Sequence, residues 1–297
     1  MSENTLNSYV FLEYKYHVAS QMDEQEHTLL IEAGRTELHY WKDLWRFREL
    51  FYFLSWRDIL VRYKQTAIGI AWSVIRPLMT MIVFTVVFGK LAKLPSEGAP
   101  YPMLVYVAML PWQFFANSLT ESSNSLISNV NLLSKVYFPR LIIPVSAVIV
   151  SLVDFFISSV ILVLLMVWYG FYLDWRVVVL PGFLLLAFIT SCGFGLWMAA
   201  LNVKYRDFRY IVPFIVQFGL FISPVGFSSN IVPEKWRLLY SLNPMVGIID
   251  GFRWAILGGS LRIYWPGFSI SIIISLSVLV LGLWYFRKTE RIFADVI

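Results

Sequence analysis

Long apolar runs dominate the chain, and short polar or charged segments separate them. At about 1.5 Å per residue, a helical run of about 20 residues crosses a hydrocarbon core of about 30 Å. Six runs come close to or exceed this length: residues 67–91, 101–119, 141–169, 177–201, 210–227 and 265–286. The pattern predicts an all-α integral membrane protein with six transmembrane helices, within a transmembrane domain over residues 67–286.

Residues 40–66, before the first run, have the pattern of an amphipathic helix. With about 100° between successive residues, apolar Trp56, Ile59, Leu60 and Tyr63 share one face. The other faces carry the charged Arg57, Asp58, Arg62 and Lys64. We expect an interface helix that lies flat on the bilayer, bends at residues 54–56 and passes force from a cytoplasmic partner into the first span. Its candidate functional residues are Arg57, Arg62, Tyr63 and Lys64.

The remaining segments take their places from the spans. Lys and Arg are more frequent on the connections that share a side with the termini, so we expect both termini in the cytoplasm. Residues 1–39 are then a cytoplasmic arm that is either partly disordered or forms a short strand at 9–16, and residues 287–297 are a cytoplasmic tail. Residues 120–140 form a cytoplasmic loop with a short helix around Leu126, Ile127 and Val130. The external segment 228–264 is too apolar for a plain loop, so we expect it to re-enter the outer leaflet as one or two short helices.

Composition supports a membrane protein and excludes several other classes. The chain is 58% hydrophobic and only 14% charged, against about 25% charged in soluble domains. Its net charge of +5 comes from basic residues that flank apolar runs, which indicates helix anchoring rather than nucleic-acid binding. The single cysteine, Cys192, cannot form an intrachain disulfide. The polar, acidic start does not resemble a cleavable signal peptide.

Two ionisable residues, Arg76 and Asp154, lie inside predicted spans. Each costs about 2.5–3.5 kcal/mol at a helix centre, so each needs a partner or water. Arg76 precedes Pro77, which kinks the helix, so the pair is a candidate gate or subunit contact; alternatively Arg76 extends to the headgroups. Asp154 either makes a polar contact in the bundle, with Arg76 as one partner, or satisfies a structural hydrogen bond.

Aromatic residues make up 18% of the chain. An interfacial belt explains most of them, and lipid contact or packing remains an alternative for each. Several lie on the three spans that are richest in polar or helix-distorting residues, where ring faces can stack on the apolar face of sugars. These candidate channel-lining residues are Trp72, Tyr106, Trp112, Phe114, Phe115, Phe218, Phe221 and Phe227.

No motif of a hydrolase, a metal centre or a phosphate-binding loop occurs in the chain. We therefore expect no catalytic residue, no metal and no cofactor in this chain. If it is an active transporter, another chain must supply the energy.

Four blocks resemble a known family. They are RYKQTAIGIAWSVIRPLMTMIVFTVVFG (62–89), KVYFPRLIIPVS (135–146), NVKYRDFRY (202–210) and SLNPMVGIIDGFRWAILG (241–258). They are similar, in this order, to the membrane subunit of ABC polysaccharide exporters, the type-2 permeases of O-antigen, capsule and teichoic acid export. The resemblance covers residues 34–291 and leaves residues 1–33 outside.

The resemblance implies a homodimer that pairs with two copies of a cytoplasmic ATPase, which binds ATP and Mg. The complex would export a glycan on undecaprenyl diphosphate across the bacterial inner membrane. The pore would form between the two permeases, chiefly from the spans at 67–91, 101–119 and 210–227, with re-entrant helices at 231–257. The ATPase contacts would map onto Asn129, Val130, Asn131, Leu132, Leu133, Lys135, Tyr137, Tyr205, Arg206 and Asp207.

Two other functions remain open from the residues alone. A drug or lipid permease of the same class would have the same spans. A membrane transferase acting on lipid-linked sugars would need an external acid/base pair, and the external segment offers Glu234 and Asp250 without a neighbouring His.

Overall fold

The computed structural model describes residues 37–64, 69–172, 174–258, 261–290 and 293. The strand expected at 9–16 lies outside these residues. The chain divides into two units, residues 1–42 and 43–297, which are taken separately. In the described part of the first unit, helix α2 (Glu37–Arg46) begins, and the rings of Tyr40 and Trp41 meet edge to face at 6.2 Å.

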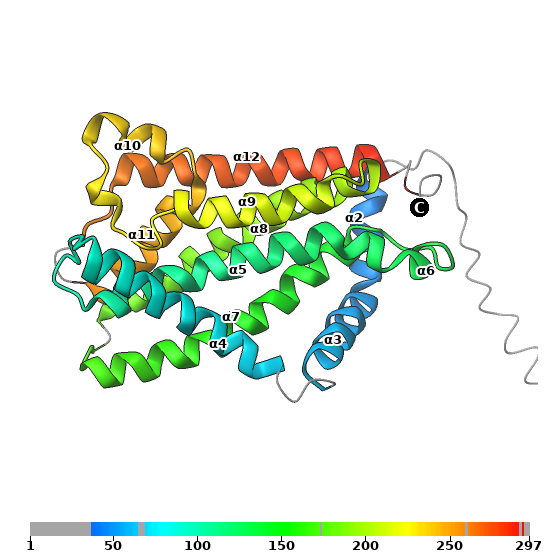
Figure 1. Ribbon diagram of the computed structural model, residues 1–297. Coiled ribbons are helices and arrows are strands. Elements are labelled where there is room, and N and C mark those ends of the chain that lie inside the picture. Colours follow the sequence, from blue (N-terminus) through cyan, green and yellow to red (C-terminus); the bar gives the residue numbers. More distant parts are fainter. Residues whose placement is uncertain (1–36, 65–68, 173, 259–260, 291–292, 294–297) are drawn as a thin grey trace, which may run out of the picture. The chain divides into compact units, whose positions relative to one another are not determined.

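Every regular element in the described ranges is a helix, which confirms the prediction of an all-α membrane protein (Figure 1). The proposed interface region contains α3 (Arg48–Lys64). The first predicted span is α4 (Gly69–Phe84), continued by the π-helix η1 (Thr85–Leu91). The remaining elements, in chain order, are α5 (Tyr101–Ser128), α6 (Val130–Leu133), α7 (Ile142–Tyr169), η2 (Trp175–Val179), α8 (Leu180–Lys204), α9 (Phe208–Ile222), η3 (Ser229–Ile231), α10 (Glu234–Tyr240), α11 (Pro244–Leu257) and α12 (Trp265–Glu290).

Four helical segments are long and apolar enough to cross a membrane. They are Val74–Leu91, Ile142–Tyr169, Trp175–Lys204 and Trp265–Glu290. Helix α9 is apolar but has only 15 residues, and α5 contains many polar residues along its 28. The six-span count therefore stays a prediction, although α5 and α9 run beside these helices (Figure 1).

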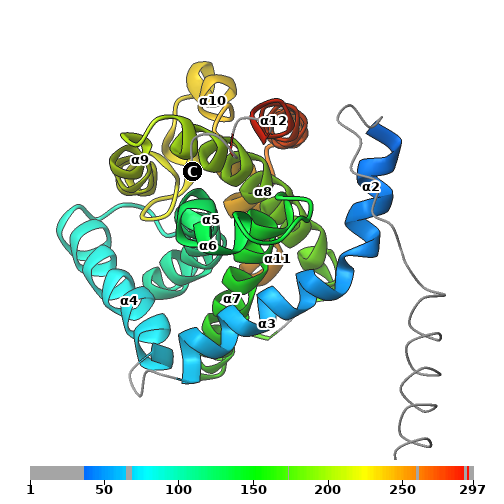
Figure 2. The same cartoon turned by 90° about the vertical axis from the view of Figure 1, so that its right-hand side faces the viewer.

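Helix α5 is the centre of the core. It packs against α4, α7, α8, α9 and α11, and Figure 2 shows these helices around it. Its side chains from Met103 to Trp112 are all buried. Burial on nearly every side explains why α5 carries apolar residues all round in this half, without an amphipathic stripe.

Helix α5 continues nine residues beyond the predicted end at residue 119. The polar residues that indicated a loop instead satisfy their hydrogen bonds within the helix. Thr120 Oγ1 donates to the carbonyl of Ala116 at 2.8 Å, and Asn124 Nδ2 donates to that of Thr120 at 2.9 Å. The short helix expected near this point is confirmed as α6, but Leu126 and Ile127 belong to α5.

Small residues let α8 and α12 approach closely. A Cβ on Gly193 would lie 2.6 Å from the backbone nitrogen of Leu279, and one on Gly282 would lie 2.3 Å from the carbonyl oxygen of Gly193. Thr190 Oγ1 also donates to Ser275 Oγ at 2.7 Å across the same pair of helices. Such small-residue contacts with interhelical hydrogen bonds are typical of helix association in membranes.

One prediction for the interface helix is wrong. The helical break falls at Phe47, between α2 and α3, and α3 runs straight through residues 54–56. A hydrogen bond from Ser55 Oγ to the carbonyl of Phe51, at 2.9 Å, fits the continuous helix. Leu54 and Ser55 are buried, while Trp56 and Leu60 of the predicted apolar face are exposed on the protein surface.

Candidate functional site

The segment predicted to contact an ATPase lies at the end of the bundle where α5 leads into α6, which we call the α6 end (Figure 1). The connection between α8 and α9 reaches the same end, since Asn202 Nδ2 donates to the carbonyl of Ser123 at 2.8 Å. The side chains of Asn131, Lys135 and Tyr137 are exposed. So are Tyr205, Arg206 and Asp207, whereas Asn129, Val130, Leu132 and Leu133 are half-buried. The structure thus gathers all ten predicted contact residues at one end, with most of them accessible.

Charged and polar side chains connect α3 to α5 and α7 near this end. Arg62 forms ion pairs with Glu121 of α5 at 3.0 Å and with Asp154 of α7 at 3.1 Å. The Tyr63 hydroxyl also donates to the Asp154 carboxylate. Arg57 donates to Asn129 Oδ1, at 3.0 Å, directly before α6. We call Arg57, Arg62, Tyr63, Glu121, Asn129 and Asp154 the α3 network.

The α3 network explains the orientation of α3. Asp154 is only 8% exposed, so its charge requires a partner, and the polar face of α3 supplies one. Arg57, Asp58 and Arg62 are accordingly half-buried, while the apolar Phe53, Trp56 and Val61 are exposed. The hydrophobic pattern identified the amphipathic helix but not the acceptor that decides which face turns inward. Lys64 lies at the end of α3, and its side chain is outside the described residues.

The proposed contact between Asp154 and Arg76 is wrong, because Asp154 pairs with Arg62 and Tyr63 of α3. Arg76 is exposed on α4, and among the described residues its side chain forms no ion pair. Pro77 is buried inside α4, as the sequence predicts, and the Arg76 carbonyl accepts from Thr80 Oγ1 at 3.0 Å. The gating role of Arg76 and Pro77 stays a prediction.

The aromatic candidates separate into two groups. Tyr106, Trp112, Phe114 and Phe115 are buried inside the protein, on α5. Tyr106 donates to the carbonyl of Ser158 at 3.0 Å, and Trp112 packs against Gly219 of α9. These four side chains therefore pack in the protomer's own core and do not face an outer surface in this conformation.

The other aromatic candidates lie on or after α9. Phe218 and Phe221 are more than half exposed, and Phe214 beside them contacts Phe218 at a ring distance of 4.3 Å. Phe227 is half-buried in the loop that follows. The side chain of Trp72 is outside the described residues. The exposed aromatic surface of the predicted lining is therefore the face of α9.

The opposite end of the bundle, which contains α10 and α11 and which we call the α11 end, is fixed by a buried arginine. Arg253 is 1% exposed and donates to three carbonyls: Leu104 at 3.1 Å, Phe227 at 2.8 Å and Val225 at 3.0 Å. It thus connects α11 to α5 and to the segment after α9. The expected short helices of this region are confirmed as α10 and α11, and Ile248, Ile249, Phe252, Ile256 and Leu257 are buried on α11. The sequence places Arg253 in the external segment 228–264, but its local pattern gives no sign of this role.

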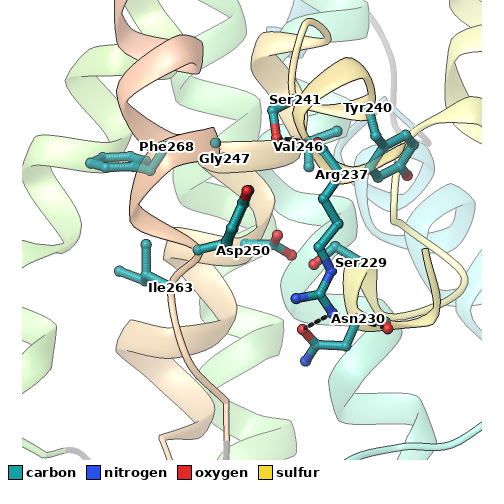
Figure 3. Close-up of a pocket in the computed structure, with 12 residues that line it drawn as sticks. Ser229, Asn230, Arg237, Tyr240, Ser241, Val246, Gly247, Asp250, Ile263 and Phe268 are labelled. Carbon is teal, nitrogen blue, oxygen red and sulfur yellow. Dashed lines mark hydrogen bonds between the residues drawn. The ribbon is translucent and has the colours of Figure 1, made fainter. Parts of the chain in front are cut away.

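A small pocket lies at this end, between α10, α11 and the start of α12 (Figure 3). Asp250, Ser241 and Arg237 line it, and Arg237 also donates to Asn230 Oδ1 at 3.1 Å. Burial raises the pKa of Asp250 to about 6, although a hydrogen bond from Ser229 and the charge of Arg253 oppose the shift. No histidine lines the pocket, and Glu234 is exposed outside it. The two acids that the sequence offered for a transferase, Glu234 and Asp250, therefore do not lie together in this pocket.

These features define a polytopic α-helical membrane protein with exposed polar side chains at one end and a buried arginine that bonds to three carbonyls at the other. Comparison with known families is more specific, since the model of the ABC-2 type transporter family matches residues 49–257. The chain belongs to this family, which confirms the resemblance drawn from the four sequence blocks. It is a transporter permease subunit, and its ATPase is a separate chain.

Two curated relatives carry names that are more specific. The O-antigen export system permease protein RfbA of Myxococcus xanthus is 29% identical over 215 residues, which cover 71% of this chain and 82% of the relative. A protein of the same name from Klebsiella pneumoniae is 28% identical over 243 residues, which cover 81% of this chain and 92% of the relative.

Proposed function

We propose that this chain is the membrane subunit of an ATP-driven exporter that moves an O-antigen-type polysaccharide, linked to undecaprenyl diphosphate, across the bacterial inner membrane. The observation that carries the proposal is the match to export permeases of that name over most of both chains. Membership of the ABC-2 family supports the transport class independently. The absence of an acid/base pair in the described pocket gives the transferase alternative no support.

The complex would contain two copies of this chain and two copies of a cytoplasmic ATPase, with ATP and Mg bound by the ATPase. Six spans would place both termini in the cytoplasm, and the α6 end would then face the ATPases. The α11 end would lie at the outer surface, where α10 and α11 re-enter the leaflet. The exposed side chains of the α6 end support this orientation, since a partner needs an accessible surface.

Force from the ATPase would reach the membrane through the α3 network. A push on α6 displaces Asn129, which bonds to Arg57 of α3. Movement of α3 then acts on α7 through Arg62 and Asp154, and on α4, which follows α3 in the chain. The kink at Pro77 gives α4 a point at which to bend, and this motion opens a passage between the two copies.

The test is complementation of a strain that lacks this gene. We expect the native chain to restore surface glycan, measured by immunoblotting of extracted glycolipid. With an ATPase subunit that cannot hydrolyse ATP, the lipid-linked glycan should accumulate inside and co-purify with the complex. Normal surface glycan in the deletion strain, or a purified chain that recruits no ATPase, would refute the proposal.

A further inference from the structure

Between Met103 and Leu126, helix α5 has one face that the core covers only in part, and this face is polar. From Met103 to Leu126, a stretch that the structure describes throughout, nearly every side chain is buried. The exceptions are Gln113, Asn117, Thr120, Glu121 and Asn124. Their spacing of three and four residues places them on one side of the helix. We call these five residues the α5 polar stripe.

With α5 as the predicted second span, the upper part of the stripe lies at membrane depth. Gln113 is twelve residues from the start of α5, which corresponds to about 18 Å along the helix, and Asn117 is about 6 Å further. Both positions fall inside a hydrocarbon core of about 30 Å. Partly exposed amides at this depth are unfavourable against lipid tails, which offer no hydrogen bonds. The stripe therefore faces water or a polar ligand.

The amides leave hydrogen-bonding groups available. Gln113 Nε2 donates to Asn117 Oδ1 at 2.9 Å, which fixes the two side chains relative to each other. Within the described part of the chain, Gln113 Oε1 and Asn117 Nδ2 have no protein partner. An acceptor and a donor thus lie side by side, and a sugar hydroxyl can bond to both because it donates and accepts.

The neighbours of the stripe suit an extended carbohydrate. Helices α4 and α9 lie on either side of α5, as Figures 1 and 2 both show, and both contact it. The exposed rings of Phe214 and Phe218 lie on α9. Only Glu121 is charged, and it is paired with Arg62. Neutral amides beside aromatic rings bind hydroxyls and sugar faces weakly, which favours a sliding chain over a fixed one.

We propose that the α5 polar stripe, led by Gln113 and Asn117, is the surface of the pathway that contacts the hydroxyl groups of the passing glycan. This inference rests on the proposed function and assigns the glycan contacts on α5 to polar residues rather than to its aromatic residues. The buried aromatic residues of α5 hold the helix in place, and the amides on its open face meet the substrate.

Cysteine labelling in cells tests the assignment. Gln113→Cys or Asn117→Cys is introduced into a Cys192→Ala chain that restores export. Cells that carry each variant are treated with a small water-soluble maleimide, once with glycan synthesis active and once with it blocked. We expect labelling without glycan and labelling at least about three-fold slower with it, because a hydrogen-bonded ligand at the stripe covers the thiol. Ser277→Cys, on the exposed side of α12, should stay unlabelled in lipid, and Tyr172→Cys, 90% exposed, should label equally in both conditions.

Each other result overturns the assignment. An unlabelled thiol at both positions means that lipid covers the stripe. A disulfide between two copies means that the stripe is a dimer contact. Equal labelling with and without glycan means that water alone fills it.

Export by leucine variants gives a second measurement. Gln113→Leu and Asn117→Leu keep the size of the side chain and remove its hydrogen bonds. With a net value of about 1 kcal/mol for a hydrogen bond, we expect export about five-fold slower for each variant at normal membrane abundance. Unchanged export at that abundance would overturn the assignment. Complementation of the deletion strain by the native chain is a separate experiment. If the native chain did not restore surface glycan, that result would refute the proposed function rather than the role of the stripe.

Discussion

The two ends of the bundle are held together by different chemistry. At the α11 end, one guanidinium that is 1% exposed bonds to three neutral backbone carbonyls. At the α6 end, the α3 network bonds charged side chains to one another, and the side chain of Arg62 remains 32% exposed. Arg253 cannot exchange its partners, because all three carbonyls lie inside the protein. Arg62 can exchange a carboxylate partner for water or for a neighbouring carboxylate.

This difference suggests a division of roles. A buried cation on internal carbonyls fixes a single arrangement, since every alternative leaves polar groups unsatisfied. Partly exposed ion pairs contribute less and break more easily. The α6 end is therefore the part of the molecule that can move when a partner acts on it, while the α11 end keeps the segments around Arg253 in register.

Removal of Arg253 should have the largest effect. Arg253→Ala removes a donor from three buried carbonyls and leaves a cavity in the core, and we expect a loss of stability on the order of 3–5 kcal/mol. Thermal unfolding of the purified complex in detergent measures the loss as a drop in Tm. Arg237→Ala, on the exposed side of the same region, is the matched control and should lower Tm only slightly. A similar small drop for Arg253→Ala would mean that the buried arginine does not hold the α11 end.

Removal of the Asp154 charge should have the next largest effect, and on function more than on stability. Asp154→Asn keeps the shape of the side chain but weakens its bond to Arg62, at a cost of about 2 kcal/mol. If the α3 network transmits force, ATP hydrolysis by the purified complex should continue while glycan export falls several-fold. Both rates are measured on the same preparation.

Glu121→Gln is the control for this variant. Glu121 pairs with the same arginine, but its side chain is 50% exposed. Gln at this position keeps a hydrogen-bonding side chain in the α5 polar stripe and removes only the exposed ion pair, which contributes about 0–1 kcal/mol, so we expect a smaller loss of export than for Asp154→Asn. Equal losses for the two variants would show that burial of the Asp154 pair has no special role in coupling.

The sequence predicted the helices well and their neighbours poorly. Apolar runs give the start of α5 and both ends of α7 to within one residue, because span length is set by the membrane. Asp154 pairs with Arg62, which is 92 positions away in the sequence, and Arg253 bonds to Leu104, which is 149 positions away. No local sequence pattern predicts contacts over such separations.

The apolar pattern also could not predict which face of α5 packs in the core, since the first half of that helix is apolar on every side. The polar residues of α5 indicate its orientation instead. Gln113, Asn117 and Thr120 recur at helical spacing and mark the face that the core does not cover. Phe114 and Phe115, which lie between them and were predicted to line the channel, are instead buried in the core.

A smaller effect should appear at the α11 end when pH changes. The pKa of Asp250 is raised from 3.8 to about 6, chiefly by burial, while Glu97 raises it further and Arg253 and Arg237 lower it. The folded protein thus holds this proton more tightly than the unfolded chain, so the contribution is fully present below pH 3.8 and is lost as pH rises through about 6. Asp250→Asn removes the dependence, and its Tm should exceed that of the native chain above pH 6 but not near pH 4. A constant difference across this range would contradict the assignment.

The smallest effect is expected at the exposed edge of the α3 network. The Arg57 side chain is 38% exposed and bonds to Asp58 beside it as well as to Asn129. Arg57→Gln should change stability by less than about 1 kcal/mol, because solvent already screens this contact. Since Asn129 directly precedes α6, we still expect a measurable drop in export, about two-fold, with Tm unchanged and with the drop smaller than that of Asp154→Asn. If Arg57→Gln lowered export as strongly as Asp154→Asn, the exposed contact at Asn129 would be the main connection to the ATPase, and the buried pair on α7 would serve only to hold α3 in place.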